Sequence, residues 1–308
     1  MMPVLHPRAS ACAKIILFGE HAVVHGQPAL AAALPDALRL EAERLDDPRA
    51  PLTLDIPAWS LSLSLVPELE HPVARACADV LAHCDGPLQG WAIRGDASIP
   101  AGAGLGSSAA LTVALAKLAL GPEAAVEEIV EASMVGEQVF HGTPSGIDSQ
   151  VAARGGVLRF VRGAAPVQVA LPRPVTLLVV PSGHARSTAA EVAKVHLALE
   201  RWPTLARPMI EVLGRTTELG ERALLEGDVA RLGQLADIAH GVLAGLGVSS
   251  PILDELCGVA RAAGAAGAKL TGAGGGGCML AWPAGDPTAL VAAFDARGLS
   301  PLVVEVGR

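Results

Sequence analysis

Hydrophobic and polar residues follow two periods along the first half of the chain. Near the N-terminus, apolar residues run or alternate over short stretches between turn residues, which predicts strands. These strands are expected at 10–18, 29–34, 37–45, 53–56 and 60–65, and another leads from 89 to 94. Further along, apolar residues recur every three or four positions, which predicts helices. The expected helices cover 71–84, 109–120 and 126–141.

The second half continues with strands and helices in a different order. Val157–Val161 and Val175–Val180 read as strands, and the helix that follows begins after Ser187, which we expect to cap it. The chain is then mostly helical from Met209 to Gly264. A strand, a helix and a last strand are expected at 279–282, 289–296 and 302–306. Strand, helices, strand, helix, strand is the pattern of an α+β layer.

Composition narrows the class of protein. The 308 residues are 51% hydrophobic, enough for a large core, but only 3% aromatic, so Ala, Leu and Val must fill the interior. A net charge of −8 argues against a general nucleic-acid or membrane surface. The five cysteines show no metal-type pairing and fit a reducing compartment. Without a signal pattern or an apolar run of about 20 residues, a soluble cytoplasmic protein is expected.

The stretch from Pro100 to Ala110 is the most unusual part of the pattern. Gly102, Gly104 and Gly106 alternate with small residues, and Ser107 and Ser108 then open an apolar helix. Glycines let backbone N–H groups turn inward, and the first turn of a helix offers unpaired N–H donors and a positive dipole end. Together they predict an anion cradle suited to a polyphosphate. The alternative is an ordinary serine cap after a flexible loop.

Four stretches of the chain resemble those of a known family. The glycine loop resembles the phosphate loop of the GHMP kinase superfamily. The run Lys14-Ile-Ile-Leu-Phe-Gly-Glu-His-Ala-Val-Val-His-Gly26 resembles the first motif of mevalonate kinases, and the glycine-rich run from Lys269 to Cys278 resembles the third motif of the superfamily. The run from Gly136 to Asp148, Gly-Glu-x-x-x-His-Gly-x-Pro-Ser-Gly-Ile-Asp, resembles a further stretch of mevalonate kinases. Taken singly, each stretch also fits an ordinary turn or a solvent-exposed helix face.

The resemblance implies a two-domain α+β fold. The N-terminal domain, expected at 1–165, would hold a mostly antiparallel sheet with helices and the phosphate loop. The C-terminal domain, expected at 166–308, would be ferredoxin-like. The resemblance also implies phosphorylation of the primary hydroxyl of (R)-mevalonate by ATP with Mg²⁺, giving 5-phosphomevalonate for isoprenoid precursor synthesis.

The resemblance assigns functional residues of the family to the positions of this chain that match its motifs. The ATP phosphates would lie on Gly102, Gly104, Leu105, Gly106, Ser107 and Ser108. Asp148 and Lys14 would be catalytic, while Ser108 and Glu137 would hold magnesium. The residues expected to bind mevalonate are Glu20, His21, Arg186, Thr188 and Gly274. The adenine would occupy an apolar pocket near the strand at 89–94, with Trp59 and Leu63 as candidate lining residues.

Two other functions stay open at this point. One is a sister enzyme, a phosphomevalonate kinase or another small-molecule GHMP kinase, although a phosphomevalonate kinase is expected to carry tyrosine at the position of His21. The other is a non-catalytic ATP-binding sensor, which would have no need of Lys14, Glu137 and Asp148 together. The family often forms dimers, so a homodimer is also left open.

Overall fold

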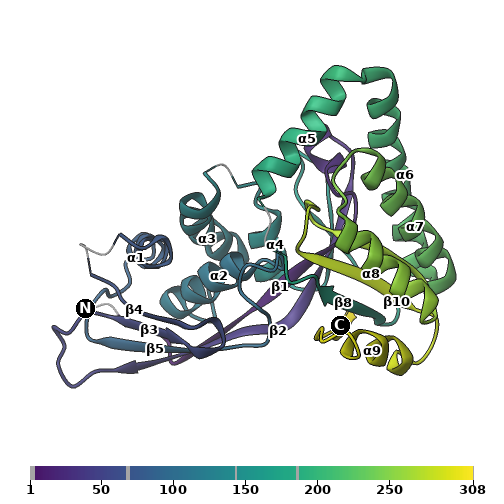
Figure 1. The fold of residues 1–308 in the computed structure, drawn as a ribbon. Coiled ribbons are helices and arrows are strands. Elements are labelled where there is room, and N and C mark those ends of the chain that lie inside the picture. The colour runs from purple at the N-terminus through teal and green to yellow at the C-terminus, as the bar shows by residue number, and fades with distance from the viewer. Residues whose placement is uncertain (1–3, 67–69, 143, 185–186, 308) are drawn as a thin grey trace. The chain divides into compact units, whose positions relative to one another are not determined.

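A computed structural model describes residues 4–66, 70–142, 144–184 and 187–307 (Figure 1). Its contacts divide the chain into a first unit, residues 1–14 and 33–155, and a second unit, residues 15–32 and 156–308. Strands β1 (Arg8–Phe18) and β2 (Ala29–Arg44) pair with each other, and each runs from one unit into the other. The linear division at 165/166 stays a prediction; the units differ from it because residues 15–32 pack with the second half.

The sheet of the first unit is mostly antiparallel, as expected. It consists of the C-terminal part of β2 with β5 (Trp91–Ala97), β3 (Thr53–Ile56) and β4 (Leu61–Ser64). β2 and β5 are antiparallel, with Leu38 opposite Ala97 and Arg44 opposite Trp91. β3 is antiparallel to β4 and parallel to β5.

Helices of the first unit lie on one side of these strands (Figure 1). They are α1 (Pro72–His83), α2 (Ser107–Leu120), α3 (Val126–His141) and α4 (Ile147–Arg154). The core joins Leu40 and Ile93 of the sheet to Val80 and Leu115 of the helices. Every residue of α2 from Ala109 to Ala116 is buried, which explains why that helix is apolar all round.

The second unit contains a four-stranded antiparallel sheet in the order β11-β8-β10-β9. Its strands are β8 (Val175–Pro181), β9 (Ala265–Thr271), β10 (Cys278–Pro283) and β11 (Leu302–Val306). Four helices separate β8 from β9: α5 (Thr188–Arg201), α6 (Pro203–Glu226), α7 (Val229–Gly245) and α8 (Pro251–Ala262). α9 (Thr288–Asp295) separates β10 from β11. This order and pairing confirm the expected ferredoxin-like layer.

Smaller elements complete the second unit. The N-terminal end of β2 pairs with β6 (Val157–Phe160), which pairs with β7 (Val167–Val169). A short 3-10 helix, η1 (Ala22–His25), follows β1; another, η2 (Pro57–Trp59), belongs to the first unit. The rings of Phe18 and Trp282 stack with centroids 5.4 Å apart. Among the described residues, no helix is both long and apolar enough to cross a membrane.

Two local predictions were wrong or incomplete. The two strands expected at 29–34 and 37–45 are one strand, β2, which continues through exposed Pro35 and Asp36 although Asp36 has a φ of 51°. The helix α4 was not predicted. The alternative of a serine cap does not hold for Ser107, since the N-cap residue of α2 is Gly106, with a left-handed φ of 78°. Ser187 does cap α5, and its hydroxyl accepts from the backbone N–H of Ala190 at 3.4 Å, which confirms that prediction.

Candidate active site

The glycine loop of the first unit is anchored at its centre and ends directly in α2. Leu105 is buried, and its carbonyl accepts from the backbone N–H of Lys14 on β1 at 2.8 Å. Gly104 and Gly106 have φ values of 81° and 78°, which favour glycine because a side chain is strained there. Since Gly106 offers no side-chain cap, the first N–H groups of α2 are left for another acceptor. This is the geometry of an anion site at a helix N-terminus.

The two serines of the loop have different surroundings. The hydroxyl of Ser107 accepts from the backbone N–H of Gly102 at 3.4 Å, which closes the loop on itself. The hydroxyl of Ser108 lies 3.5 Å from Nε2 of His141, near the end of α3. Ser108 is therefore the serine that connects the loop with the polar groups of α3.

A lysine and a carboxylate meet beside this loop. Nζ of Lys14 lies 3.1 Å from Oδ2 of Asp148; the lysine side chain is 9% exposed and the aspartate 32%. Asp148 stands in the first turn of α4, where the helix dipole favours a negative charge. A Cβ added at Gly106 would lie 3.6 Å from Lys14 and 3.7 Å from Asp148, so the pair lies against the loop. The pair can orient a hydroxyl group and stabilise negative charge next to a bound phosphate.

Glu137 on α3 is a buried carboxylate with an unsatisfied oxygen. Its Oε2 lies 3.7 Å from Nε2 of His141, while Oε1 has no hydrogen-bond partner within the described residues. Burial raises the pKa of Glu137 to about 7; the Ser108 hydroxyl and Lys14 oppose this rise, and Asp148 adds to it. A buried carboxylate oxygen without a partner is costly. The arrangement therefore suits a cation.

That cation would have few protein ligands. In the described part of the chain, no group of three or more His, Cys, Asp or Glu side chains is placed to hold a metal ion. Magnesium commonly takes one or two carboxylates and fills its other positions with water and substrate phosphates. Glu137 and Ser108 fit that pattern.

The second unit contains another polar cluster. Glu20 is buried and forms an ion pair with Nζ of Lys269 on β9, which also donates to the carbonyl of Leu270 at 2.8 Å. Burial raises the pKa of Glu20 and lowers that of Lys269, and each partner opposes the shift of the other. Nε2 of His21 donates to the carbonyl of Ala273 at 2.8 Å. The first motif is thereby tied to the strand and loop of the third motif.

The glycine-rich loop after β9 is packed tightly against its own unit. A Cβ added at Gly274, which has a φ of 82°, would lie 2.0 Å from the carbonyl oxygen of Val248. The N–H of Gly275 donates to that same oxygen at 2.8 Å, and the N–H of Gly277 donates to the carbonyl of His184 at 3.0 Å. The loop is thus a fixed backbone surface, which excludes the alternative of a simple flexible turn.

The remaining predicted substrate residues are placed less fully. Thr188 is the exposed first residue of α5 and stands next to the cap residue Ser187. Arg186 lies outside the described residues. The direct contacts with substrate predicted for Glu20, His21, Arg186, Thr188 and Gly274 stay predictions. Because the side chains of Glu20 and Lys269 are both 0% exposed, the pair would support substrate binding by holding the neighbouring backbone in place.

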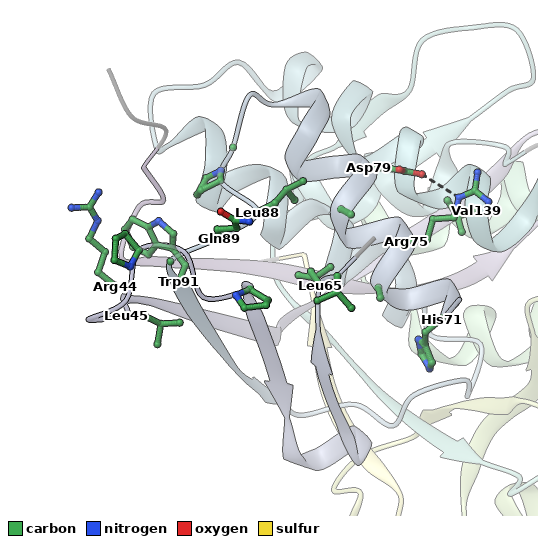
Figure 2. A pocket seen from close by; sticks show the side chains of 18 of the residues that line it. Arg44, Leu45, Leu65, His71, Arg75, Asp79, Leu88, Gln89, Trp91 and Val139 are labelled. Atoms are coloured by element: carbon green, nitrogen blue, oxygen red, sulfur yellow. Dashed lines mark ion pairs between the residues drawn. The ribbon is translucent and has the colours of Figure 1, made fainter. Parts of the chain in front are cut away.

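A large cavity lies in the first unit, along α1 (Figure 2). Its volume is about 1570 Å³, and Gln89 and Trp91, from the region expected near the adenine, contribute to its lining; the adenine pocket itself stays a prediction. Val139 of α3 also lines it, two positions from Glu137 and two from His141 along the helix. Trp59 and Leu63 are not among the described lining residues; the indole N–H of Trp59 instead donates to the carbonyl of Ile99 at 2.8 Å.

A Cys-His-Asp arrangement in the second unit is structural rather than catalytic. Nδ1 of His240 lies 3.7 Å from Sγ of Cys257, and Nε2 lies 3.1 Å from Oδ1 of Asp254. However, Cys257 is buried, and burial raises the pKa of its thiol to about 12. Nδ1 also accepts from the backbone N–H of Leu270 at 3.3 Å. A buried thiol of this kind is not a nucleophile. The cluster instead connects α7, α8 and β9 by these contacts.

Two polar residues of these clusters were not identified from the sequence. Lys269 lies in an apolar strand, and a lysine in such a strand is a signal that a buried carboxylate partner exists. His141 gave a weaker signal, its position one helical turn after Glu137. Neither position reveals its partner, since both contacts depend on how helices and strands pack.

Comparison with known proteins agrees with this geometry. Family models for the N-terminal domain and the C-terminal region of GHMP kinases match residues 72–156 and 221–298. The chain is 36% identical to the mevalonate kinase of Pyrococcus furiosus, covering 97% of this chain and 96% of that one. It is 37% identical to the mevalonate kinase of Aeropyrum pernix, covering 89% and 87%.

A solved structure resembles the whole fold. The L. major mevalonate kinase in complex with R-mevalonate matches with a TM-score of 0.85 and 27% identity, over 98% of this chain and 99% of that one. The two domain matches, the relatives above 30% identity and this structure agree with one another. The chain therefore belongs to the mevalonate kinase family of the GHMP kinases.

Proposed function

We propose that this enzyme transfers the γ-phosphoryl group of ATP to the primary hydroxyl of (R)-mevalonate. The product would be 5-phosphomevalonate, an intermediate of isoprenoid precursor synthesis. The observation that carries the proposal is the Lys14–Asp148 pair lying against a glycine loop at the N-terminus of α2. The names of the relatives, and the R-mevalonate bound in the L. major structure, support this choice of acceptor.

In the proposed reaction, the first unit supplies the groups around the phosphate. Backbone N–H groups of residues 102–108 would bind the ATP phosphates. Asp148 would accept a hydrogen bond from the substrate hydroxyl and orient its oxygen toward the γ-phosphorus. Lys14 would stabilise the negative charge that spreads over the transferred group. Because phosphoryl transfer has a loose transition state, positioning and charge compensation carry most of the catalysis.

We further propose that Glu137 and Ser108 would hold magnesium together with the ATP phosphates. When bound, the ion would supply positive charge that offsets the negative charge of the phosphates. The support is the unsatisfied Oε1 of Glu137 and the position of the Ser108 hydroxyl near the same α3 residues. A buried carboxylate with a pKa of about 7 also loses its proton readily when a cation arrives.

The second unit would bind the polar end of mevalonate. His21, Thr188, Arg186 and the backbone at Gly274 would provide direct contacts, and Glu20 would act by fixing Lys269. The support is the bond from His21 to Ala273, which joins the first motif to the fixed glycine-rich loop.

A cytoplasmic location and a homodimer also remain part of the proposal. All five cysteines, which lie within the described residues, are thiols, in keeping with a reducing compartment. Light scattering of the purified protein would measure the oligomeric state directly.

The proposal is tested by ADP release with magnesium-ATP and one acceptor at a time. The acceptors are (R)-mevalonate, 5-phosphomevalonate, galactose and homoserine. Release with mevalonate alone is expected. Release with another acceptor would move the substrate assignment, whereas ATP binding without any release would favour the non-catalytic sensor.

A further inference from the structure

Three fully buried hydroxyl groups of the first unit form a chain through its helices. Oγ1 of Thr112 on α2 lies 2.8 Å from Oγ of Ser133 on α3. Ser133 in turn donates to Oγ of Ser149 on α4 at 2.9 Å. Each hydroxyl carries one proton, so when Ser133 donates to Ser149, Thr112 is the donor to Ser133. Thr112 shares that proton with the carbonyl oxygens of Ser108 and Ala109, both 3.2 Å from Oγ1. The result is a directed chain of two hydrogen bonds across three helices.

Each member of this chain stands beside a residue of the proposed site. Thr112 lies one turn after Ser108 on α2, and its hydroxyl is also 3.2 Å from the carbonyl oxygen of Ser108. Ser133 lies one turn before Glu137 on α3, and Ser149 directly follows Asp148 on α4. The three helices that carry the loop serine, the buried glutamate and the aspartate are therefore joined by hydroxyl groups.

Close packing makes these bonds possible. A Cβ added at Gly136 would lie 2.5 Å from Cγ2 of Thr112, so α3 approaches α2 closely at that point. Contacts between small apolar side chains are non-directional and tolerate sliding of one helix along another. A buried hydroxyl that loses its partner instead remains desolvated at a cost. The hydroxyl chain therefore specifies one relative position of the three helices.

We propose that Thr112, Ser133 and Ser149 are positioning residues for phosphoryl transfer, which hold Ser108, Glu137 and Asp148 in register. This inference rests on the proposed function for the roles of those three residues. The three hydroxyls are buried between the helices, so they would not reach a nucleotide or a substrate. They act by fixing the helices that do, and displacements of about 1 Å can lower a rate roughly 100-fold.

The test compares two replacements at one position. Thr112→Val keeps the shape of the side chain and removes the hydroxyl, whereas Thr112→Ser keeps the hydroxyl and removes the methyl. Thr112→Val and Ser133→Ala are expected to lower kcat about 10-fold or more with little change in KM for mevalonate. Thr112→Ser is expected to retain most of kcat. Thr216→Val is the matched control, because Thr216 is a buried threonine of α6 that donates to the carbonyl of Leu213 at 2.8 Å.

A second measurement needs no acceptor. Calorimetry gives the affinity for ADP with and without Mg²⁺, and the ratio of the two reports the placement of Ser108 and Glu137. Thr112→Val and Ser133→Ala are expected to reduce that ratio, while Thr112→Ser and Thr216→Val preserve it. If the wild type does not phosphorylate mevalonate, the proposed function fails, but the ratio still tests the hydroxyl chain.

Several results would overturn the inference. One is the finding that Thr112→Val and Ser133→Ala have the same kcat and the same magnesium ratio as the wild type. In that case they would lose only as much stability as Thr216→Val does. Equal losses of kcat in Thr112→Val and Thr112→Ser would assign the effect to packing rather than to the hydroxyl. If Ser133→Ala does not fold, the pair of Thr112 variants decides the question alone.

Discussion

In each unit of this enzyme a buried lysine pairs with a carboxylate, and the two pairs differ in exposure. In the first unit, Asp148 beside Lys14 is 32% exposed, at 3.1 Å from Nζ. In the second unit, the side chains of Glu20 and Lys269 are both 0% exposed. A pair that must meet a substrate needs a reachable carboxylate. A pair without exposed surface can only hold other parts of the protein in place.

The surroundings of the two pairs share one feature and differ in another. Oε1 of Glu137, near Lys14 and Asp148, and Oε2 of Glu20 are both buried without a hydrogen-bond partner among the described residues. Around Glu20, however, Lys269 also donates to the carbonyl of Leu270, and Thr271 donates to the carbonyl of Ile16 at 2.8 Å, so the groups next to the buried pair are bonded within the protein. The pair in the first unit is therefore placed to act in the reaction, whereas the pair in the second unit stabilises the structure. The following substitutions test that difference.

The largest effect is expected from Asp148→Asn. The amide keeps the shape of the side chain but loses the charge that orients and accepts from the substrate hydroxyl, so kcat should fall by about 10³-fold or more. Affinity for magnesium-ADP and thermal stability should change little, because Asp148 is partly exposed. Calorimetry, thermal melting and steady-state kinetics measure the three quantities. A folded variant with wild-type kcat would remove Asp148 from the mechanism.

The buried pair should show the opposite behaviour. Lys269→Met leaves Glu20 buried without its cation, and breaking a buried pair costs about 3–5 kcal/mol of unfolding free energy. Lys14→Met should cost about 1 kcal/mol, since its partner is partly solvated, and should mainly lower kcat. The measurement is urea unfolding of both variants.

A double variant controls for loss of fold. Glu20→Leu combined with Lys269→Met removes both charges, and should recover much of the stability that Lys269→Met alone loses. Equal destabilisation by Lys14→Met and Lys269→Met would contradict the contrast between the two pairs.

The raised pKa of Glu137 predicts that the free energy of unfolding falls as the pH rises. Its pKa in the folded protein is about 7, raised from 4.5 by burial, so folding favours the protonated form. Its stabilising contribution is complete below pH 4.5 and is lost as the pH rises to about 7. Relative to Glu137→Gln, the wild type without magnesium should lose about 2 kcal/mol of unfolding free energy between pH 5 and 8. A pH-independent difference between the two proteins would show that Glu137 ionises normally.

Much of the fold could be predicted because periodicity reports which faces are buried. The strand Thr53–Ile56, the helix Val126–His141 and the ferredoxin-like order of the second unit are examples. α4 was missed because it is short and follows glycine and proline, which usually mark a loop. β2 was divided because Pro35 and Asp36 resemble a turn, although the pairing of the strand continues beyond them.

The site was predictable to a different extent. Motifs pointed to Lys14, Asp148, Ser108 and Glu137, and the structure brings these side chains together around one glycine loop. The hydroxyl chain through Ser133 could not be foreseen, because a serine within a helix has no pattern that separates a buried network from an ordinary small residue. Only the packing of α2, α3 and α4 reveals it.

The smallest effect concerns two neighbouring residues at the start of α5. Ser187 accepts from the N–H of Ala190, so Ser187→Ala should lower the unfolding free energy by about 1 kcal/mol and leave KM for mevalonate unchanged. Thr188→Ala should do the reverse, raising KM with little loss of stability, because its exposed side chain has the proposed substrate role. Urea unfolding and steady-state kinetics of both variants separate the two. If Ser187→Ala raised KM and Thr188→Ala did not, the contact with substrate would belong to the cap residue instead.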